Sequence, residues 1–323
     1  MKKIEYGLIV KKSFSLAKKE KWLLVYGLTI ASLTGGSGSN FSRQFDSQEA
    51  GTLAGSLPEN VQALVNSFLY WVQHLNPGSL GAFLGGTGIL FIFSIIIAWV
   101  ASSWAQAALI KGSEDGLENK KVDFKKLSKE GIGYIKKFII FAVLTFLAGL
   151  VFGIAVAIAA GLIALLSVVA KVYVLAVILG VAAVAAFIYG VIILTLMTNF
   201  AQRLIVLKNY TPANALKTGL KTATQHFWNG VKLGVLNSLV SLGIGLATVL
   251  VIGLVLGIPA IILASPIFDV IAGKPLTIAP VSVAGLLSLL LLFIWSNKIV
   301  SAFLVVYKAT TWNMFFKEIW KEN

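Results

Sequence analysis

The residues of this 323-residue chain that are best suited to chemistry are a few polar side chains inside long apolar runs. Lys298 lies within the run IWSNKIVSAF, where its ammonium group could bind an anion or extend toward lipid headgroups. Gln202 and Arg203 end a second run, and Asn237 lies within a third. Hydrogen bonds between helices are the alternative use of such groups. We therefore predict a candidate intramembrane polar site that consists of Lys298, Asn297, Asn237, Gln202 and Arg203.

Signatures of enzymes and metal centres are missing from the sequence. Cysteine is absent, which excludes disulfides and thiolate metal sites. The two histidines, His74 and His226, have no second histidine or carboxylate at ligand spacing. The motifs G-x-S-x-G, H-E-x-x-H and Walker A do not occur. We predict a non-enzymatic protein without catalytic residues, cofactor or bound metal.

Lysines give the chain its net charge of +14, and most of them lie in the gaps on one side of the apolar runs. Cytoplasmic loops of membrane proteins are enriched in Lys and Arg, so we attribute this charge to topology and predict no nucleic-acid partner. Both termini are then cytoplasmic in a multi-pass protein of the plasma membrane. The lysines predicted to contact anionic headgroups of the inner leaflet are Lys11, Lys12, Lys18, Lys19, Lys125, Lys126, Lys217 and Lys221.

The apolar runs themselves predict the fold class. The chain is 58% hydrophobic and 12% charged, whereas about 25% of residues are charged in a soluble domain. A helix needs about 20 apolar residues to cross a membrane. We predict an all-α integral membrane protein with a single membrane domain, 1–323. Its six transmembrane helices are predicted at 22–38, 82–107, 138–165, 173–200, 233–262 and 281–306.

Three lysine-bearing amphipathic stretches precede pairs of spans and suggest an internal repeat. They read VKKSFSLAKKEKW, DFKKLSKEGIGYIKKF and ANALKTGLKTATQHFW, and each ends at an aromatic residue. Two of the returning spans share an Ala-Gln pair, at 105–106 and 201–202. We predict three helical hairpins in a degenerate repeat, with units of approximately 1–111, 112–208 and 209–323. The amphipathic helices could lie in the membrane interface or form a cytoplasmic cap on the bundle.

The sequence also predicts structural features of the outer loop, the fifth span and the third span. An outer-side loop and helix are predicted at 38–80, with helical periodicity over 61–75. Pro259 is expected to break the fifth span near its outer end. Small residues at intervals of four in the third span predict close packing between helices of this chain, with a dimer seam as the alternative. These small residues are Gly149, Gly153, Ala157 and Gly161.

The segment 203–235, RLIVLKNYTPANALKTGLKTATQHFWNGVKLGV, resembles the membrane region attached to some glycerophosphoryl diester phosphodiesterases of prokaryotes. The matching features are Leu204–Leu207, Asn209–Pro212, Ala215-Leu216 and Phe227-Trp228, and SFSLAKKEKWLLVYGL is also similar. The resemblance implies a six-helix scaffold. It transfers neither site residues nor phosphodiesterase activity, which belongs to a separate soluble barrel in that family.

These observations together predict a scaffold, accessory subunit or lipid-organising protein. Its expected partners are membrane lipids, anionic inner-leaflet headgroups, and a protein partner or further copies of itself. The alternative is a transporter or permease for a small or amphipathic solute, which the apparent repeat and the glycine-rich spans favour. The absence of Asp and Glu from the predicted spans disfavours a proton- or sodium-coupled carrier.

Overall fold

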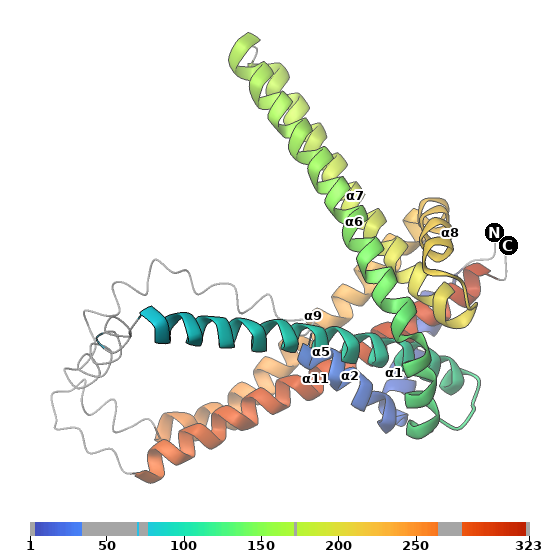
Figure 1. Cartoon of the computed structure of the whole chain (residues 1–323). Helices are drawn as coiled ribbons and strands as arrows, with labels where there is room; N and C mark the ends of the chain where they lie inside the picture. Colours follow the sequence, from blue (N-terminus) through green and yellow to red (C-terminus); the bar gives the residue numbers. More distant parts are fainter. Residues whose placement is uncertain (1–3, 34–69, 71–76, 171–172, 264–279, 321–323) are drawn as a thin grey trace.

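The computed structural model describes residues 4–33, 70, 77–170, 173–263 and 280–320 (Figure 1), and within these ranges it contains helices and no strands. The all-α fold class is thus confirmed for the described part of the chain. The helices are α1 (Tyr6–Lys19), α2 (Lys21–Leu33), α5 (Pro77–Leu117), α6 (Phe124–Ala170), α7 (Tyr173–Leu207), α8 (Pro212–Gln225), α9 (Phe227–Leu263) and α11 (Pro280–Trp320).

In the described part of the chain, five helices are long and apolar enough to cross a membrane, as expected of a multi-pass membrane protein. The five segments are Gly88–Leu117, Phe124–Leu165, Val177–Leu207, Phe227–Leu263 and Leu287–Trp320. The first predicted span, 22–38, is described only as far as Leu33. Its helix α2 has 13 residues and is about 20 Å long, which is less than the roughly 30 Å of a hydrocarbon core.

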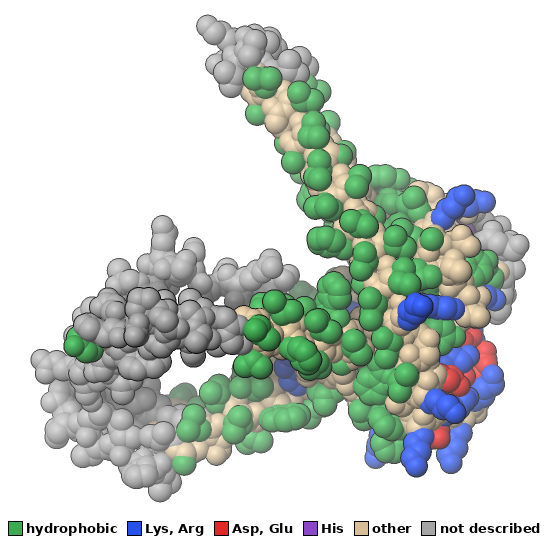
Figure 2. All heavy atoms as spheres, in the orientation of Figure 1, with side chains coloured by type: hydrophobic (Ala, Val, Ile, Leu, Met, Phe, Trp, Pro, Cys, Tyr) green, Lys and Arg blue, Asp and Glu red, His purple; other side chains and the backbone are tan. Residues whose placement is uncertain are grey.

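The spans diverge instead of forming one closed bundle. Helices α6 and α7 form a hairpin that projects in one direction, while α5, α9 and α11 extend in another (Figure 1). Phe152 stacks on Phe187 within the first arm, and Leu263 lies against Gly285 at the far end of the second. Hydrophobic side chains cover the described surface of both arms (Figure 2). Such surfaces suit a hydrocarbon solvent, since lipid tails are as apolar as these side chains.

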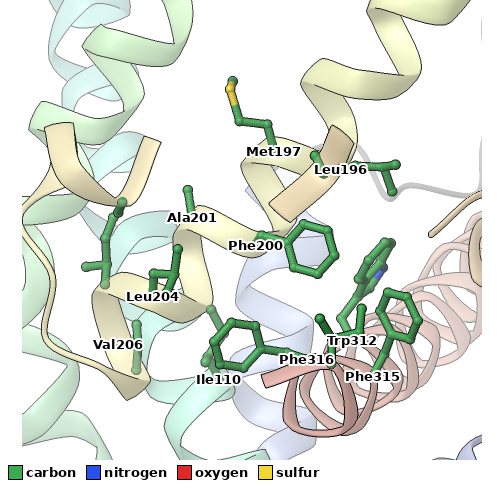
Figure 3. Packing of buried hydrophobic residues seen from close by; sticks show 14 of the residues in the cluster. Ile110, Leu196, Met197, Phe200, Ala201, Leu204, Val206, Trp312, Phe315 and Phe316 are labelled. Atoms are coloured by element: carbon green, nitrogen blue, oxygen red, sulfur yellow. The ribbon is translucent and has the colours of Figure 1, made fainter. Parts of the chain in front are cut away.

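The core lies where the helices converge, at the ends opposite the arms. One cluster, here called the phenylalanine cluster, centres on Phe200, whose ring lies 5.9 Å from Trp312 and 6.0 Å from Phe315 (Figure 3). The second, the tyrosine cluster, centres on Tyr26, which packs between Trp104 and Phe124. The hydroxyl of Tyr26 donates to the Phe124 carbonyl oxygen at 2.9 Å, so this buried ring has its polar atom satisfied.

The three lysine-bearing stretches pack on returning spans at this convergent end. α1 packs on α11, the first turns of α6 pack on α5, and α8 packs on α7. Each contact has a small buried residue: Ser13, Gly131 or Gly219. A Cβ on Gly131 would lie 2.8 Å from the Trp104 carbonyl oxygen, and one on Gly219 would lie 2.9 Å from that of Met197. Glycine therefore permits these backbones to approach more closely than any other residue would allow.

Two structural expectations prove wrong in the described residues. α9 continues through Pro259 to Leu263, the last described residue of this segment, because the loss of the one backbone N–H of a proline need not end a helix. Nothing lies within 4 Å of a Cβ built on Gly149, Gly153 or Gly161, so these glycines have no packing partner in the part of the chain that the structure describes. The hairpin closes through Phe152 and Gly190 instead. The predicted helix 61–75 lies outside the described residues.

Candidate functional site

Arg203 is the most unusual polar residue of the convergent end. Its side chain is 2% exposed, and its guanidinium lies 5.8 Å from the Trp312 ring centre. Nη1 donates to the Asn199 carbonyl oxygen at 2.7 Å, and Nη2 donates to that of Ala309 at 3.3 Å. Its Nε has no hydrogen-bond partner among the described residues. The contacts connect α7 to α11 but leave the positive charge without a carboxylate.

Gln202 and Asn237 are also placed at the convergent end. Gln202 donates from Nε2 to Oε1 of Gln106 at 3.2 Å, which joins α7 to α5. These are the two glutamines of the shared Ala-Gln pairs. Asn237 is 4% exposed on α9, and neither polar atom of its side chain has a partner within the described residues. Burial of such an amide costs roughly 1–3 kcal/mol, which makes this position a structural weakness or an incomplete site.

Lys298 and Asn297 lie apart from these groups. Lys298 donates from Nζ to the Ala31 carbonyl oxygen at 3.2 Å, which joins α11 to α2 near the end of the described part of α2. Asn297 donates to the Phe293 carbonyl oxygen of its own helix. Lys298 and Ala309 are eleven positions apart, which corresponds to about 16 Å of helix. The predicted polar site is therefore divided between two levels of the membrane domain.

A shallow, open concavity of about 310 Å³ lies along one face of α7, and its lining residue Asn199 is one helical turn from Arg203. Its lining combines Val191 and Leu194 with Thr195, Thr198 and Asn199. Each polar lining side chain also donates to a carbonyl oxygen one turn earlier in α7, at 2.8–2.9 Å. The sequence places Asn199 beside Gln202 and Arg203 in a polar cluster at the end of the fourth span, but Thr195 was not predicted to belong to the site. The signal is nevertheless readable, because Thr195, Asn199 and Arg203 recur at intervals of four and so share one helix face.

The predicted inner-leaflet lysines are all exposed on the amphipathic segments. Figure 2 shows most of the lysine and arginine side chains gathered at the convergent end, whereas Lys298 lies within the second arm, where it is partly exposed. Lys126 differs from the others because it pairs with the buried carboxylate of Asp115 at 3.0 Å. It therefore stabilises the start of α6 against α5.

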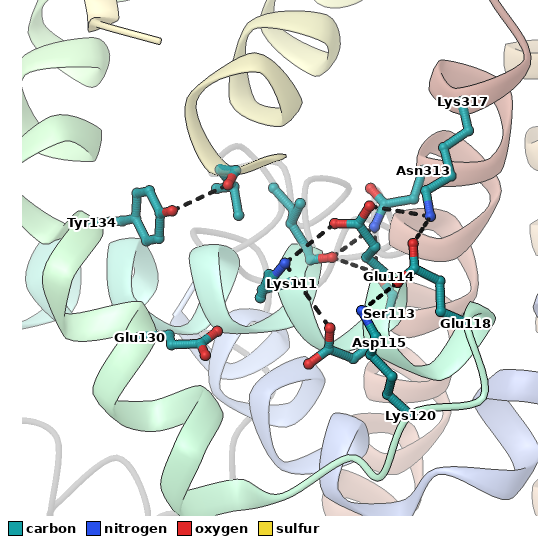
Figure 4. A network of polar contacts seen from close by, with 12 residues as sticks. Lys111, Ser113, Glu114, Asp115, Glu118, Lys120, Glu130, Tyr134, Asn313 and Lys317 are labelled. Atoms are coloured by element: carbon teal, nitrogen blue, oxygen red, sulfur yellow. Dashed lines mark hydrogen bonds and ion pairs between the residues drawn. The ribbon is translucent and has the colours of Figure 1, made fainter. Parts of the chain in front are cut away.

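An ion-pair network joins the ends of α5 and α11 (Figure 4). Lys317 of α11 lies 3.1 Å from Glu114 and 2.7 Å from Glu118, both near the end of α5. Lys111 lies 3.6 Å from Glu114. Beneath these pairs, the buried Asn313 donates to the Ile110 carbonyl oxygen at 2.7 Å. The acidic residues are thus matched by lysines and serve to hold two returning spans together.

Glu118 predicts a small acid sensitivity. Hydrogen bonds from Lys120 and Lys317 lower the pKa of Glu118 from 4.5 to about 2. Its contribution to stability is therefore present above pH 4.5 and is lost as the pH falls toward about 2. The side chain is 39% exposed, so solvent screening limits the contribution to roughly 1 kcal/mol or less. We expect wild type to be more stable than Glu118→Gln near neutral pH, with the difference vanishing near pH 2. Thermal unfolding in detergent measures both proteins; a difference that persists in acid would show that the ionised carboxylate is not its source.

Comparison with known proteins finds no matching family model, no similar curated protein and no similar solved structure. The fold itself defines the class, which is an all-helical protein with several apolar helices of membrane-spanning length. Function must therefore be argued from the surfaces and polar groups described above.

Proposed function

We propose that the chain is a non-enzymatic scaffold of the prokaryotic plasma membrane that organises anionic lipids at the inner leaflet. The observation that carries this proposal is the separation of charge from apolar surface. Exposed lysines of all three amphipathic segments gather at the convergent end, and apolar arms extend away from it (Figure 2). In a membrane this arrangement would place the arms in hydrocarbon and the lysines at headgroup level, with both termini cytoplasmic.

The six-span repeat is part of this proposal. α2 would be the beginning of a sixth span that continues beyond Leu33. Matched positions in two of the units support the repeat. Glu20 separates the amphipathic helix α1 from the span that follows it, seven residues after Ser13. His226 separates α8 from its span in the same way, seven residues after Gly219. A second similarity lies at the ends of α5 and α7. In each case an asparagine with positive φ follows two residues after the helix: Asn119 at 55° and Asn209 at 57°.

The proposed mechanism is electrostatic, because the bundle already uses much of the apolar face of the amphipathic helices. Buried residues of α1 and α8, such as Ile9 and Ala223, pack in the phenylalanine cluster. The lysines remain outside, and each would contribute about 1 kcal/mol at an anionic surface. Exposed aromatic rings at the same level, Trp22 and Trp228, would add interfacial anchoring.

A charge-removal variant tests the lipid-organising function. Replacing Lys11, Lys12, Lys18, Lys19, Lys125, Lys217 and Lys221 with glutamine should abolish enrichment of anionic lipid around the protein, because the attraction is coulombic. Lys126 is left in place since it holds Asp115. The measurement is the lipid composition of polymer-bounded native discs extracted from vesicles of equal phosphatidylglycerol and phosphatidylcholine content.

The matched control replaces the same lysines with arginine, which keeps the charge and should keep the enrichment. Equal lipid composition in the glutamine and wild-type discs would contradict the proposal. A stoichiometric protein in discs from native membranes would instead support the accessory-subunit form of the scaffold.

A further inference from the structure

The buried charge of Arg203 is uncompensated. A cation in a low-dielectric interior is costly unless an anion accompanies it. Among the described residues no carboxylate pairs with Arg203, whose polar contacts are two carbonyl oxygens. The runs of sequence on either side cannot supply one either, because 173–202 and 204–262 contain no Asp or Glu. Arg203 is thus a buried positive charge that has no anionic partner among the described residues.

The α7 concavity adjoins this charge. Asn199 lines the concavity with its side chain, while its carbonyl oxygen accepts the hydrogen bond from Arg203 Nη1 at 2.7 Å. The guanidinium therefore lies within about one helical turn of the polar end of the concavity, on the side that packs against α11. The second N–H of the Asn199 amide can donate a hydrogen bond there, and the hydroxyl groups of Thr195 and Thr198 can do so when they rotate away from the Val191 and Leu194 carbonyl oxygens. The far end is apolar, with Val191 and Leu194.

Along α7, polar lining residues are followed by apolar ones, in the same order as the headgroup and acyl chains of a phospholipid. In the proposed orientation, Asn199 lies toward the cytoplasmic headgroups and Val191 lies one to two turns deeper in the hydrocarbon. An anionic headgroup would meet the donors and the field of Arg203, and its acyl chain would lie along the apolar end. The ammonium of a zwitterionic headgroup would be repelled by the same field.

We infer that this concavity binds one acidic phospholipid of the inner leaflet, with Arg203 as its buried counter-charge. The inference rests on the proposed lipid-organising function but concerns a single retained molecule, whereas the lysines act on the surrounding lipid. Arg203 acts through the wall of the concavity, so its effect is electrostatic and does not depend on direct contact.

Native mass spectrometry of delipidated protein tests the inference, with phosphatidylglycerol and phosphatidylcholine of identical chains as probes. We expect wild type to bind one phosphatidylglycerol about tenfold more tightly than phosphatidylcholine. Arg203→Gln should remove most of this preference. The double variant Thr195→Val and Thr198→Val should weaken phosphatidylglycerol binding several-fold. The control Thr248→Val removes a hydroxyl that donates to its own helix in the same way on α9, and it should bind as wild type does.

Equal binding of the two lipids by wild type would overturn the inference. So would an undiminished preference in the threonine double variant, which decides the matter if Arg203→Gln does not fold. Displacement of phosphatidylglycerol by inorganic phosphate would show that the concavity recognises a free anion and not a lipid. The lysine-to-glutamine variant separates this site from the proposed function: it should lose bulk enrichment and retain the single tightly bound lipid.

Discussion

Replacement of Phe200 with alanine is expected to destabilise the protein by about 3–5 kcal/mol, as is usual when a buried phenylalanine is removed from a well-packed core. Phe200 is fully buried in the phenylalanine cluster, where its ring contacts those of Trp312 and Phe315. Its loss would leave a cavity between α7 and α11 that two large rings cannot easily fill. Equilibrium unfolding in mixed micelles measures the change.

The matched control is Phe146→Ala on α6. That ring is 68% exposed on the arm, so its removal should change stability by no more than about 0.5 kcal/mol. The contrast follows from the location of the core, since lipid or detergent can replace a partner on the arms but not within the cluster. Equal losses in the two variants would show that the arms pack against each other in the membrane and that the convergent end is not the main source of stability.

Features that depend on local sequence could be predicted. Long uncharged runs give helices regardless of their neighbours, and the described helices α5, α6, α7, α9 and α11 each include most of a predicted span. Their ends were less predictable. α6 begins at Phe124, well before the predicted start at 138, because the amphipathic stretch and the span form one continuous helix. No residue at that junction interrupts the backbone hydrogen bonding. The sequence therefore does not show that the helix continues from the amphipathic stretch into the span without a break.

Contacts between helices were predictable only in part. In lipid, the apolar surface of a neighbouring helix resembles the solvent, so hydrophobic pattern does not reveal which face is covered. Gln202 and Arg203 were recognised from their position at the end of a span. Their partners Gln106 and Ala309 lie on other helices, and no spacing rule connects them. Lys298 could likewise be recognised as unusual, but its acceptor on α2 depends on tertiary structure alone.

Glycines show most clearly that sequence pattern alone does not predict which helix faces are in contact. Gly153 belongs to a regular stripe yet has open space beside it, whereas Gly27 belongs to no stripe and lies against α11. A Cβ on Gly27 would be 2.6 Å from the Ala302 carbonyl oxygen and 3.0 Å from Cγ2 of Val306. Regular spacing of small residues shows only that a second helix could approach that face closely. Close contact also requires that another backbone be brought to that face.

Gly27→Val is therefore expected to destabilise the protein by about 1–3 kcal/mol or more, as overpacking of a tight contact does. The obstructing atom belongs to the α11 backbone, so no side-chain rotation relieves the clash, and α2 must move away from α11. This movement would also disturb the neighbouring Tyr26 and its hydrogen bond to Phe124. Unfolding in mixed micelles again gives the free-energy change.

Gly153→Val makes the same substitution where nothing lies within 4 Å, and we expect the stability of the monomer to remain unchanged. The comparison isolates the close approach, because both variants replace a helical glycine with the same residue. A large loss in Gly153→Val, together with a change in oligomeric state on native mass spectrometry, would show that the stripe on α6 packs between copies of the chain. A large loss without such a change would mean that the α6–α7 arm folds back onto the other spans, and the open arrangement of the arms would then be wrong.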